Sequence, residues 1–222
     1  MKKYFFALAA LVCLAYSGHS QNVRLNVYGN YVFNDHISSY YSSTSYFDGT
    51  VNGGFLWGGG LEFMLKQYYS AELAYLRLDT HVPINYYDYN AGRAKTANLD
   101  ANLNYILLHL GRSVHVNDKV EPYGGIGLGV CIIDAKNPTQ NTSGSVTKFA
   151  WDLRAGVNIW ATESVGLKLQ VQLLSAVQGA GGGLYFGTGG AGAGISTYST
   201  MLQFAIGGGL TFRFGGHSSG QH

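Results

Sequence analysis

Charged and other polar side chains recur at alternate positions in two stretches of the sequence, which places them on one face of an extended strand. In KFAWDLRAGVNIW, Asp152 and Arg154 oppose large apolar residues, and in ESVGLKLQVQLLSAV, Lys168 opposes leucines and valines. Opposite charges form pairs when they are buried together, because an isolated buried charge is costly. The spacing therefore predicts paired charges on the polar face of a sheet.

Two histidines lie close to groups that would support a different chemistry. His36 follows Asp35, and His81 follows Asp79 and Thr80. Enzymes that deacylate or transfer lipid acyl groups need a histidine within reach of a serine or an acid at the lipid-facing outer rim. We interpret both histidines as solvated loop residues. No set of residues has the spacing of a metal site, and we predict no cofactor.

The elements that must position these residues have a period of two. Eight segments alternate apolar and polar residues, and most are 10 to 14 residues long. A tilted membrane-spanning strand needs ~9–11 residues, whereas a typical soluble strand has ~5–6. The segments are Val23–Phe33, Gly54–Leu65, Tyr69–Leu78, Leu99–Arg112, Val120–Ile133, Lys148–Trp160, Glu163–Val177 and Met201–Phe214.

The first twenty residues have the pattern of a secretory signal peptide. Two lysines precede about thirteen apolar residues and then small residues, a stretch too short for a spanning helix. We place cleavage after Ser20, which leaves 12 basic and 12 acidic residues and a single cysteine, Cys131. The mature chain therefore has no intrachain disulfide and no charge excess that would indicate nucleic-acid binding.

Composition and connection lengths both favour a membrane barrel. Charged residues make up 12% of the chain, about half the usual share. Short connections, near Gln67 and at Ser113–Asp118 and Ala161–Ser164, alternate with long ones. This is the layout of an outer-membrane barrel with short periplasmic turns and long extracellular loops. The long connections are Asn34–Gly53, Thr80–Asn98, Ala135–Thr147 and Ala176–Ser199.

We therefore predict an all-β fold, a transmembrane antiparallel up-and-down β-barrel of eight strands. The barrel occupies residues 21–214, after a signal peptide at residues 1–20, and residues 215–222 form a short periplasmic tail. A hairpin hidden in Ala176–Ser199 would raise the number of strands to ten.

In such a barrel the apolar face of each strand meets lipid and the polar face lines the lumen. This rule points Leu103 and Tyr105 toward lipid and Asp100 inward. An eight-stranded lumen is only wide enough to be filled by side chains, so we expect its charges to pair. Lys168 is expected to pair with Glu62, Glu72 or Glu121. The predicted lumen charges, five of each sign, are Arg24, Glu62, Glu72, Asp100, Arg112, Glu121, Asp152, Arg154, Lys168 and Arg213.

Three stretches carry a resemblance to a known family: EPYGGIGLGV (Glu121–Val130), DLRAGVNIWATESVGLKLQV (Asp152–Val171) and GGGLTFRF (Gly207–Phe214). The chain resembles the small outer-membrane β-barrel superfamily that includes the transmembrane domain of outer-membrane protein A. It is most similar to the outer membrane protein β-barrel domain (porin-family) proteins of Bacteroidota-type bacteria. The resemblance covers essentially the whole mature chain and implies a location in the bacterial outer membrane. It supplies no catalytic residue.

We expect a non-enzymatic outer-membrane barrel with a structural or surface-interaction role and a lumen filled by a charge-paired core. The expected partners are outer-membrane lipid and lipopolysaccharide, the barrel-assembly machinery through the last strand, and a surface ligand at the long loops. Two alternatives stay open. A narrow porin-like channel would require an open lumen, and a lipid-modifying enzyme would depend on His36 or His81.

Overall fold

The structure is a computed structural model that describes residues 23–42, 45–66, 68–88, 93–138, 142–177, 183–187, 190–194 and 201–214. The predicted signal peptide and the predicted tail lie outside these residues. The strands are β1 (Val23–Val32), β2 (Asp35–Ser42), β3 (Ser45–Val51), β4 (Gly54–Lys66), β5 (Tyr69–Asp88), β6 (Arg93–Ser113), β7 (Val120–Asn137), β8 (Thr142–Trp160), β9 (Val165–Val177), β10 (Gly183–Gly187), β11 (Gly190–Gly194) and β12 (Met201–Phe214).

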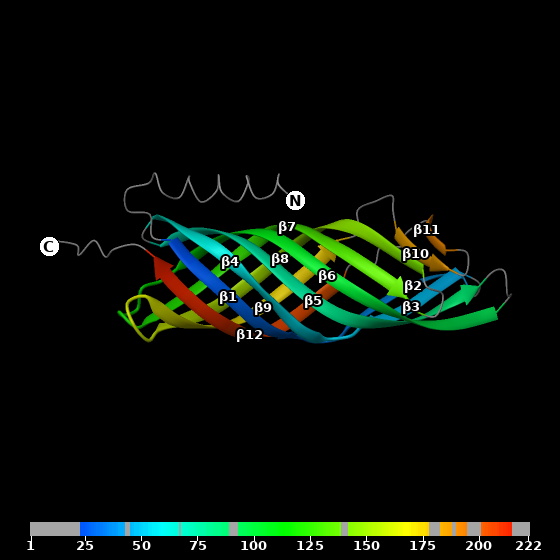
Figure 1. Cartoon of the computed structure of the whole chain (residues 1–222), viewed down its shortest axis with the longest axis horizontal. Helices are drawn as coiled ribbons and strands as arrows, with labels where there is room; N and C mark the ends of the chain where they lie inside the picture. The colour runs from blue at the N-terminus through cyan, green and yellow to red at the C-terminus, as the bar shows by residue number, and fades with distance from the viewer. Residues whose placement is uncertain are drawn as a thin grey trace.

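Eight of the strands close into an antiparallel barrel (Figure 1). β1, β4, β5, β6, β7, β8, β9 and β12 pair in chain order, and β1 pairs with β12 so that Val23 lies opposite Phe214. The prediction of eight strands is confirmed. The segment Ala176–Ser199 does contain a hairpin, β10–β11, but these strands form a separate two-stranded sheet and add nothing to the barrel wall.

The two ends of the barrel differ greatly. One end, the short-turn rim, carries the connections β4–β5, β6–β7 and β8–β9. At the other end, the long-strand rim, β5 and β6 remain paired as far as Asp88 and Arg93, and β7 and β8 as far as Asn137 and Thr142. The β2–β3 hairpin adds to the edge of β5 there. Much of what we expected to be long loop is therefore strand.

The alternation of β5 changes its polarity part of the way along the strand. Near the short-turn rim, Glu72 points inward and Leu73 outward, whereas farther along Leu78 points inward and Asp79 outward. The same alternate positions of β5 point inward in both parts of the strand. What changes is the medium outside the barrel, which is lipid near the short-turn rim and water farther along. A membrane wall needs an apolar exterior, and a wall in water needs an apolar interior. The barrel thus continues beyond its lipid-facing part with the side-chain pattern of a soluble protein. We call this part, formed by the ends of β5, β6, β7 and β8 at the long-strand rim, the extension.

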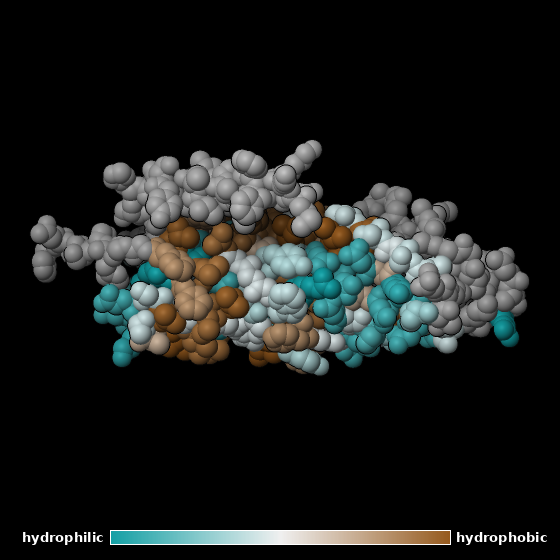
Figure 2. Space-filling view, in the orientation of Figure 1, coloured by the Kyte–Doolittle hydropathy of each residue, from teal (hydrophilic) through white to brown (hydrophobic). Residues whose placement is uncertain are grey.

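Large apolar side chains cover the outside of the barrel nearest the short-turn rim. We call this surface the apolar belt, and Figure 2 shows it in brown, with patches of hydrophilic residues in teal beyond it. Each of its members is more than a third exposed. They include Val27, Tyr31, Phe55, Trp57, Leu73, Tyr75, Ile106, Leu108, Leu110, Ile126, Leu128, Val130, Phe149, Leu153, Ile159, Leu167, Leu169, Val171, Leu202, Phe204, Ile206, Leu210 and Phe214.

No helix long and apolar enough to cross a membrane occurs among the described residues.

Candidate functional site in the barrel lumen

The barrel wall directs eight of the ten predicted charges into the lumen. Seven of them are at most 8% exposed, and the side chain of Arg213 is 18% exposed. They comprise four positive and four negative groups, so the set is formally neutral. These lumen charges are Arg24, Arg154, Lys168, Arg213, Glu62, Glu72, Glu121 and Asp152.

The other two predicted charges, Asp100 and Arg112, lie on the outside of the barrel, so their assignment to the lumen was wrong. Asp100 belongs to the extension, where the polar face of β6 is turned to the exterior, and Tyr105 of the same strand is fully buried inside. Arg112 lies near the short-turn rim, with its guanidinium 5.7 Å from the ring of Tyr69. Removing one charge of each sign leaves the lumen balanced.

Nearest the short-turn rim, two arginines and a tryptophan surround the carboxylate of Glu121 of β7. Arg24 of β1 donates from Nη1 and Nη2 to the two carboxylate oxygens of Glu121 at 2.6 and 3.1 Å. Arg213 of β12 approaches Glu121 to 3.7 Å and places its guanidinium 4.0 Å from the ring of Trp160. The indole Nε1 of Trp160 also donates to Glu121, at 3.3 Å. Bidentate pairing and ring stacking are geometries that arginine favours over lysine.

A second cluster joins β1, β5 and β8 across the lumen. Arg154 donates from Nη1 to Glu72 Oε2 at 3.0 Å and to the hydroxyl of Tyr28 at 2.9 Å. The Tyr28 hydroxyl in turn donates to Glu72 Oε1 at 2.5 Å. Asn26 divides its amide group between Glu72 and Glu62, at 3.0 Å each. Glu72 is therefore held by three different side chains, and Asn26 links it to the neighbouring carboxylate.

Lys168 of β9 points inward and is 2% exposed. Its Nζ lies 3.8 Å from Glu62 Oε2, so Glu62 is the carboxylate partner among the three candidates. The ammonium group also lies 4.2 Å from the centre of the Tyr123 ring, which offers a cation–π contact.

His109 of β6 is a member of the network that the sequence analysis missed. Its Nε2 accepts from Arg154 Nη2 at 2.7 Å, and its Nδ1 lies 3.3 Å from Asp152 Oδ1. Arg154 Nη2 lies 3.6 Å from Asp152 Oδ2, and Gln172 donates to the same carboxylate. The arrangement suits a neutral imidazole, with its proton on Nδ1 directed toward the carboxylate.

Glycine at position 127 creates the space for this arrangement. A Cβ added to Gly127 of β7 would lie 2.6 Å from His109 Cε1 and would overlap the Asp152 carboxylate. Gly60 of β4 plays the same part for Glu72, whose carboxylate would overlap a Cβ there. The bulky charged groups can approach one another only because these inward positions carry no side chain.

Beyond the charged network, toward the long-strand rim, the lumen is mainly apolar. Tyr105 is fully buried there, and its hydroxyl donates to Gln203 at 3.1 Å, which closes the polar region. Cys131, which pairs with Tyr105 in register, faces the same interior and is also fully buried. The lumen therefore has two layers, one of paired charges and one of hydrocarbon. The second layer, the apolar plug, includes Leu56, Leu76, Leu78, Leu103, Tyr105, Leu107 and Leu174, none more than 2% exposed.

The two rim histidines lie apart from this network. His81 lies on the outside of the extension, where its Nδ1 is 2.8 Å from Asp100 Oδ1 and both side chains are more than half exposed. His36 is exposed, and its Nδ1 lies 3.4 Å from Thr50 Oγ1. His81 therefore has an acidic neighbour, and that pair is exposed to solvent.

Comparisons with known proteins agree with this architecture. The family model described as the outer membrane protein beta-barrel domain matches residues 5–195. A comparison with curated protein sequences finds no significant match.

Several solved structures share the fold at low sequence identity. The outer membrane protein OprG from Pseudomonas aeruginosa is 13% identical over 90% of this chain and 99% of its own, with a TM-score of 0.55. Neisserial surface protein A is 13% identical over 87% of this chain and 97% of its own, with a TM-score of 0.53. The protease OmpT from Escherichia coli is 8% identical over 89% and 98%, with a TM-score of 0.51.

Identities this low establish a shared fold and not a shared activity. The match to the family model covers most of the chain, and the eight-stranded barrel carries an apolar belt outside and paired charges inside. This chain belongs to the outer membrane protein β-barrel family, a family of the bacterial outer membrane.

Proposed function

We propose that this protein is a non-conducting, non-enzymatic barrel that anchors a folded platform outside the outer membrane, where the platform contacts a surface ligand. The observation that carries the proposal is the filling of the lumen by two successive layers. Four positive and four negative side chains, joined by ion pairs, occupy the part nearest the short-turn rim, and the apolar plug around Tyr105 occupies the part beyond it. Ions would have to displace both layers to pass.

The extension supplies the platform. In β5, β6, β7 and β8 the pairing continues well beyond the apolar belt, with an apolar interior and an exterior that carries Asp79, His81 and Asp100. Binding proteins commonly carry their contact residues on a sheet scaffold of this kind. The extension is therefore suited to present a binding surface, and it contributes nothing to a channel.

Single-channel recording in planar bilayers tests the closed lumen. The mature chain is refolded, and its folding is verified by heat-modifiable gel mobility before it is added to the bilayer. We expect folded protein to produce no steady conductance. Steady conductance from folded protein would overturn the proposal and favour the narrow porin-like channel.

Orientation is tested on intact cells with single cysteines and a maleimide that does not cross membranes. Lys136 and Glu163 are both exposed, one in the extension and one in the β8–β9 turn, and native Cys131 is buried. We expect Lys136→Cys to react on intact cells and Glu163→Cys to react only after the outer membrane is permeabilised. The reverse pattern would place the extension in the periplasm and remove the basis for a surface ligand.

The lipid-modifying alternative is tested through the mass of lipid A. We expect cells that express the protein to have unchanged lipid A, because the His81–Asp100 pair is open to solvent on the outer face of the extension. A mass change that His81→Ala or His36→Ala abolishes would establish an enzyme.

A further inference from the structure

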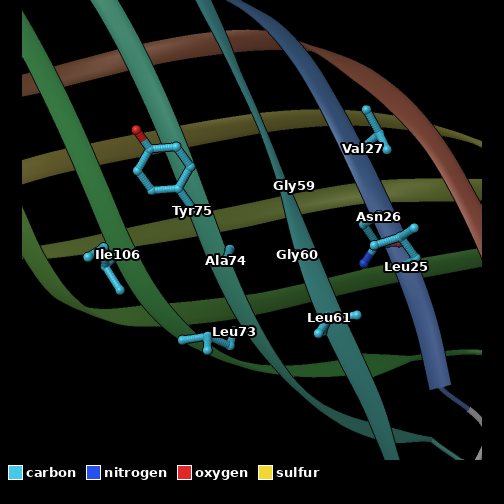
Figure 3. A pocket seen from close by; sticks show the side chains of 10 residues that line it. All are labelled: Leu25, Asn26, Val27, Gly59, Gly60, Leu61, Leu73, Ala74, Tyr75 and Ile106. Carbon is cyan, nitrogen blue, oxygen red and sulfur yellow. The ribbon is translucent and has the colours of Figure 1, made fainter. Parts of the chain in front are cut away.

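A groove lies in the apolar belt, on the outer surface of β1, β4, β5 and β6 (Figure 3). It has a volume of about 400 Å³. Apolar side chains form its sides, and a backbone segment of β4 forms its floor. The lining includes Leu25, Val27, Leu61, Leu73, Tyr75 and Ile106, with Gly59 at the floor.

The groove exists because one outward position of the wall has no side chain. Val27, Gly59 and Tyr75 lie opposite one another on β1, β4 and β5, so glycine stands between two large outward residues. A Cβ at Gly59 would lie only 3.0 Å from the carbonyl oxygen of Asn26. The wall is therefore hollow at this point and flanked by hydrocarbon on both sides.

The position of the groove along the barrel indicates what fills it. It lies in the apolar belt, and it ends where the polar exterior of the extension begins. The hydroxyl of Tyr75 donates to Asn104 Oδ1 at 2.8 Å, and Arg77 is the next outward residue of β5. Arg77 donates from Nε and Nη2 to Asp79 and has a weaker contact from Nη1 to Asn104 at 3.4 Å, so N–H groups remain for a further acceptor.

We propose that this groove holds one acyl chain of the lipid A part of lipopolysaccharide, with the phosphate-bearing head beside Arg77. The groove is continuous with the lipid-facing surface, so hydrocarbon is the solvent that reaches it. Its polar end lies toward the long-strand rim, which places it in the outer leaflet. The inference rests on the orientation proposed above, and that orientation has its own test in the cysteine labelling.

Arg77 contributes the second element of recognition. Its side chain is 32% exposed beside Tyr75 at the end of the groove, where the N–H groups that Asp79 and Asn104 leave over can donate to a phosphate oxygen. A hydrocarbon slot that ends at a guanidinium matches a molecule in which acyl chains join a phosphorylated head. A neutral hydrocarbon would use only the slot.

Native mass spectrometry of the refolded barrel in detergent micelles tests the proposal. Hexa-acylated lipid A and phosphatidylethanolamine are the two probes, added separately at equal concentration. We expect one lipid A to stay bound to the native chain. Ile106→Trp fills the groove and should lower lipid A affinity by about tenfold, and Arg77→Gln should lower it by a similar factor.

Ile206→Trp is the matched control, because Ile206 is an exposed belt isoleucine of β12 outside the groove. It should bind lipid A as the native chain does, and heat-modifiable mobility confirms that each variant is folded. Equal loss in both tryptophan variants, or no loss in either, would overturn the site. Equal retention of phosphatidylethanolamine would overturn the assignment to lipid A, and a stable dimer without lipid would show that a second copy covers the groove.

Discussion

Arg154 on β8 and Glu72 on β5 form an ion pair across the lumen, with Nη1 and Oε2 3.0 Å apart and both side chains at most 6% exposed. Each group also has other partners in the network, so a loss at either position affects more than one contact. Removing one partner of a buried pair is much more damaging than removing an exposed charge, because the other charge stays buried without compensation.

Arg154→Gln should therefore lower the free energy of unfolding by about 3–5 kcal/mol. Arg112→Gln makes the same chemical change at an arginine on the outside and should cost about 1 kcal/mol or less. Urea unfolding of both variants in lipid vesicles measures the difference. Equal losses at the two positions would contradict the placement of Arg112 outside the lumen.

Gly127→Ala should destabilise the barrel by about 1–3 kcal/mol, because its Cβ would enter the space of His109 and Asp152. The matched control is Gly124→Ala on the same strand, where the nearest atom, the carbonyl oxygen of Arg154, lies at an ordinary distance of 3.6 Å. Thermal shift of the heat-modifiable gel band gives the ranking. If both alanines are tolerated equally, the packing described around His109 is incorrect.

The polarity change along β6 predicts that a lysine is tolerated at one position of the strand and not at the next. Leu103→Lys places an ammonium group in the apolar plug and should prevent folding or cost several kcal/mol. Asn102→Lys, one residue away on the outside of the extension, should fold with native yield. The fraction folded in vesicles, read from gel mobility, separates the two. A folded Leu103→Lys variant would show that the plug is open to water.

Tryptophan fluorescence reports directly which side chains meet lipid. Trp57 is 46% exposed in the apolar belt, whereas Trp160 is 6% exposed against Arg24 and Arg213 in the lumen. In variants that retain one tryptophan each, brominated lipids should quench Trp57 strongly and Trp160 weakly. Comparable quenching at both positions would place Trp160 outside the lumen.

The number of barrel strands and most of the lumen charges follow from alternation alone, because strands such as β8 and β9 keep one polarity along nearly all the length that spans the membrane. β6 does not. In LNYILLHLGR (Leu103–Arg112) the apolar residues change sides, from Leu103 and Tyr105 to Ile106 and Leu108. This change marks the boundary of the belt, and it also carries His109 inward. The rule that the apolar face meets lipid, applied to the whole segment, therefore placed Asp100 and Tyr105 on the wrong sides of the barrel wall.

The pairing of side chains within the lumen could not be predicted in the same way. Glu62, Glu72 and Glu121 were equivalent candidates for Lys168, since each lies on an inward face. Only the stagger of the strands around the closed barrel brings Lys168 near Glu62, and alternation within one strand carries no information about that stagger.

The change of polarity on β5 and β6 also fixes how deep the barrel lies in the membrane. If the barrel moved inward by four residues, Arg77 and Asp79 would both enter the hydrocarbon, at a cost of a few kcal/mol for each charge near the midplane and less near the interface. If it moved outward by the same distance, Leu73 and Tyr75 would leave lipid for water. The sequence of β5 and β6 thus sets the depth at which the barrel sits in the membrane.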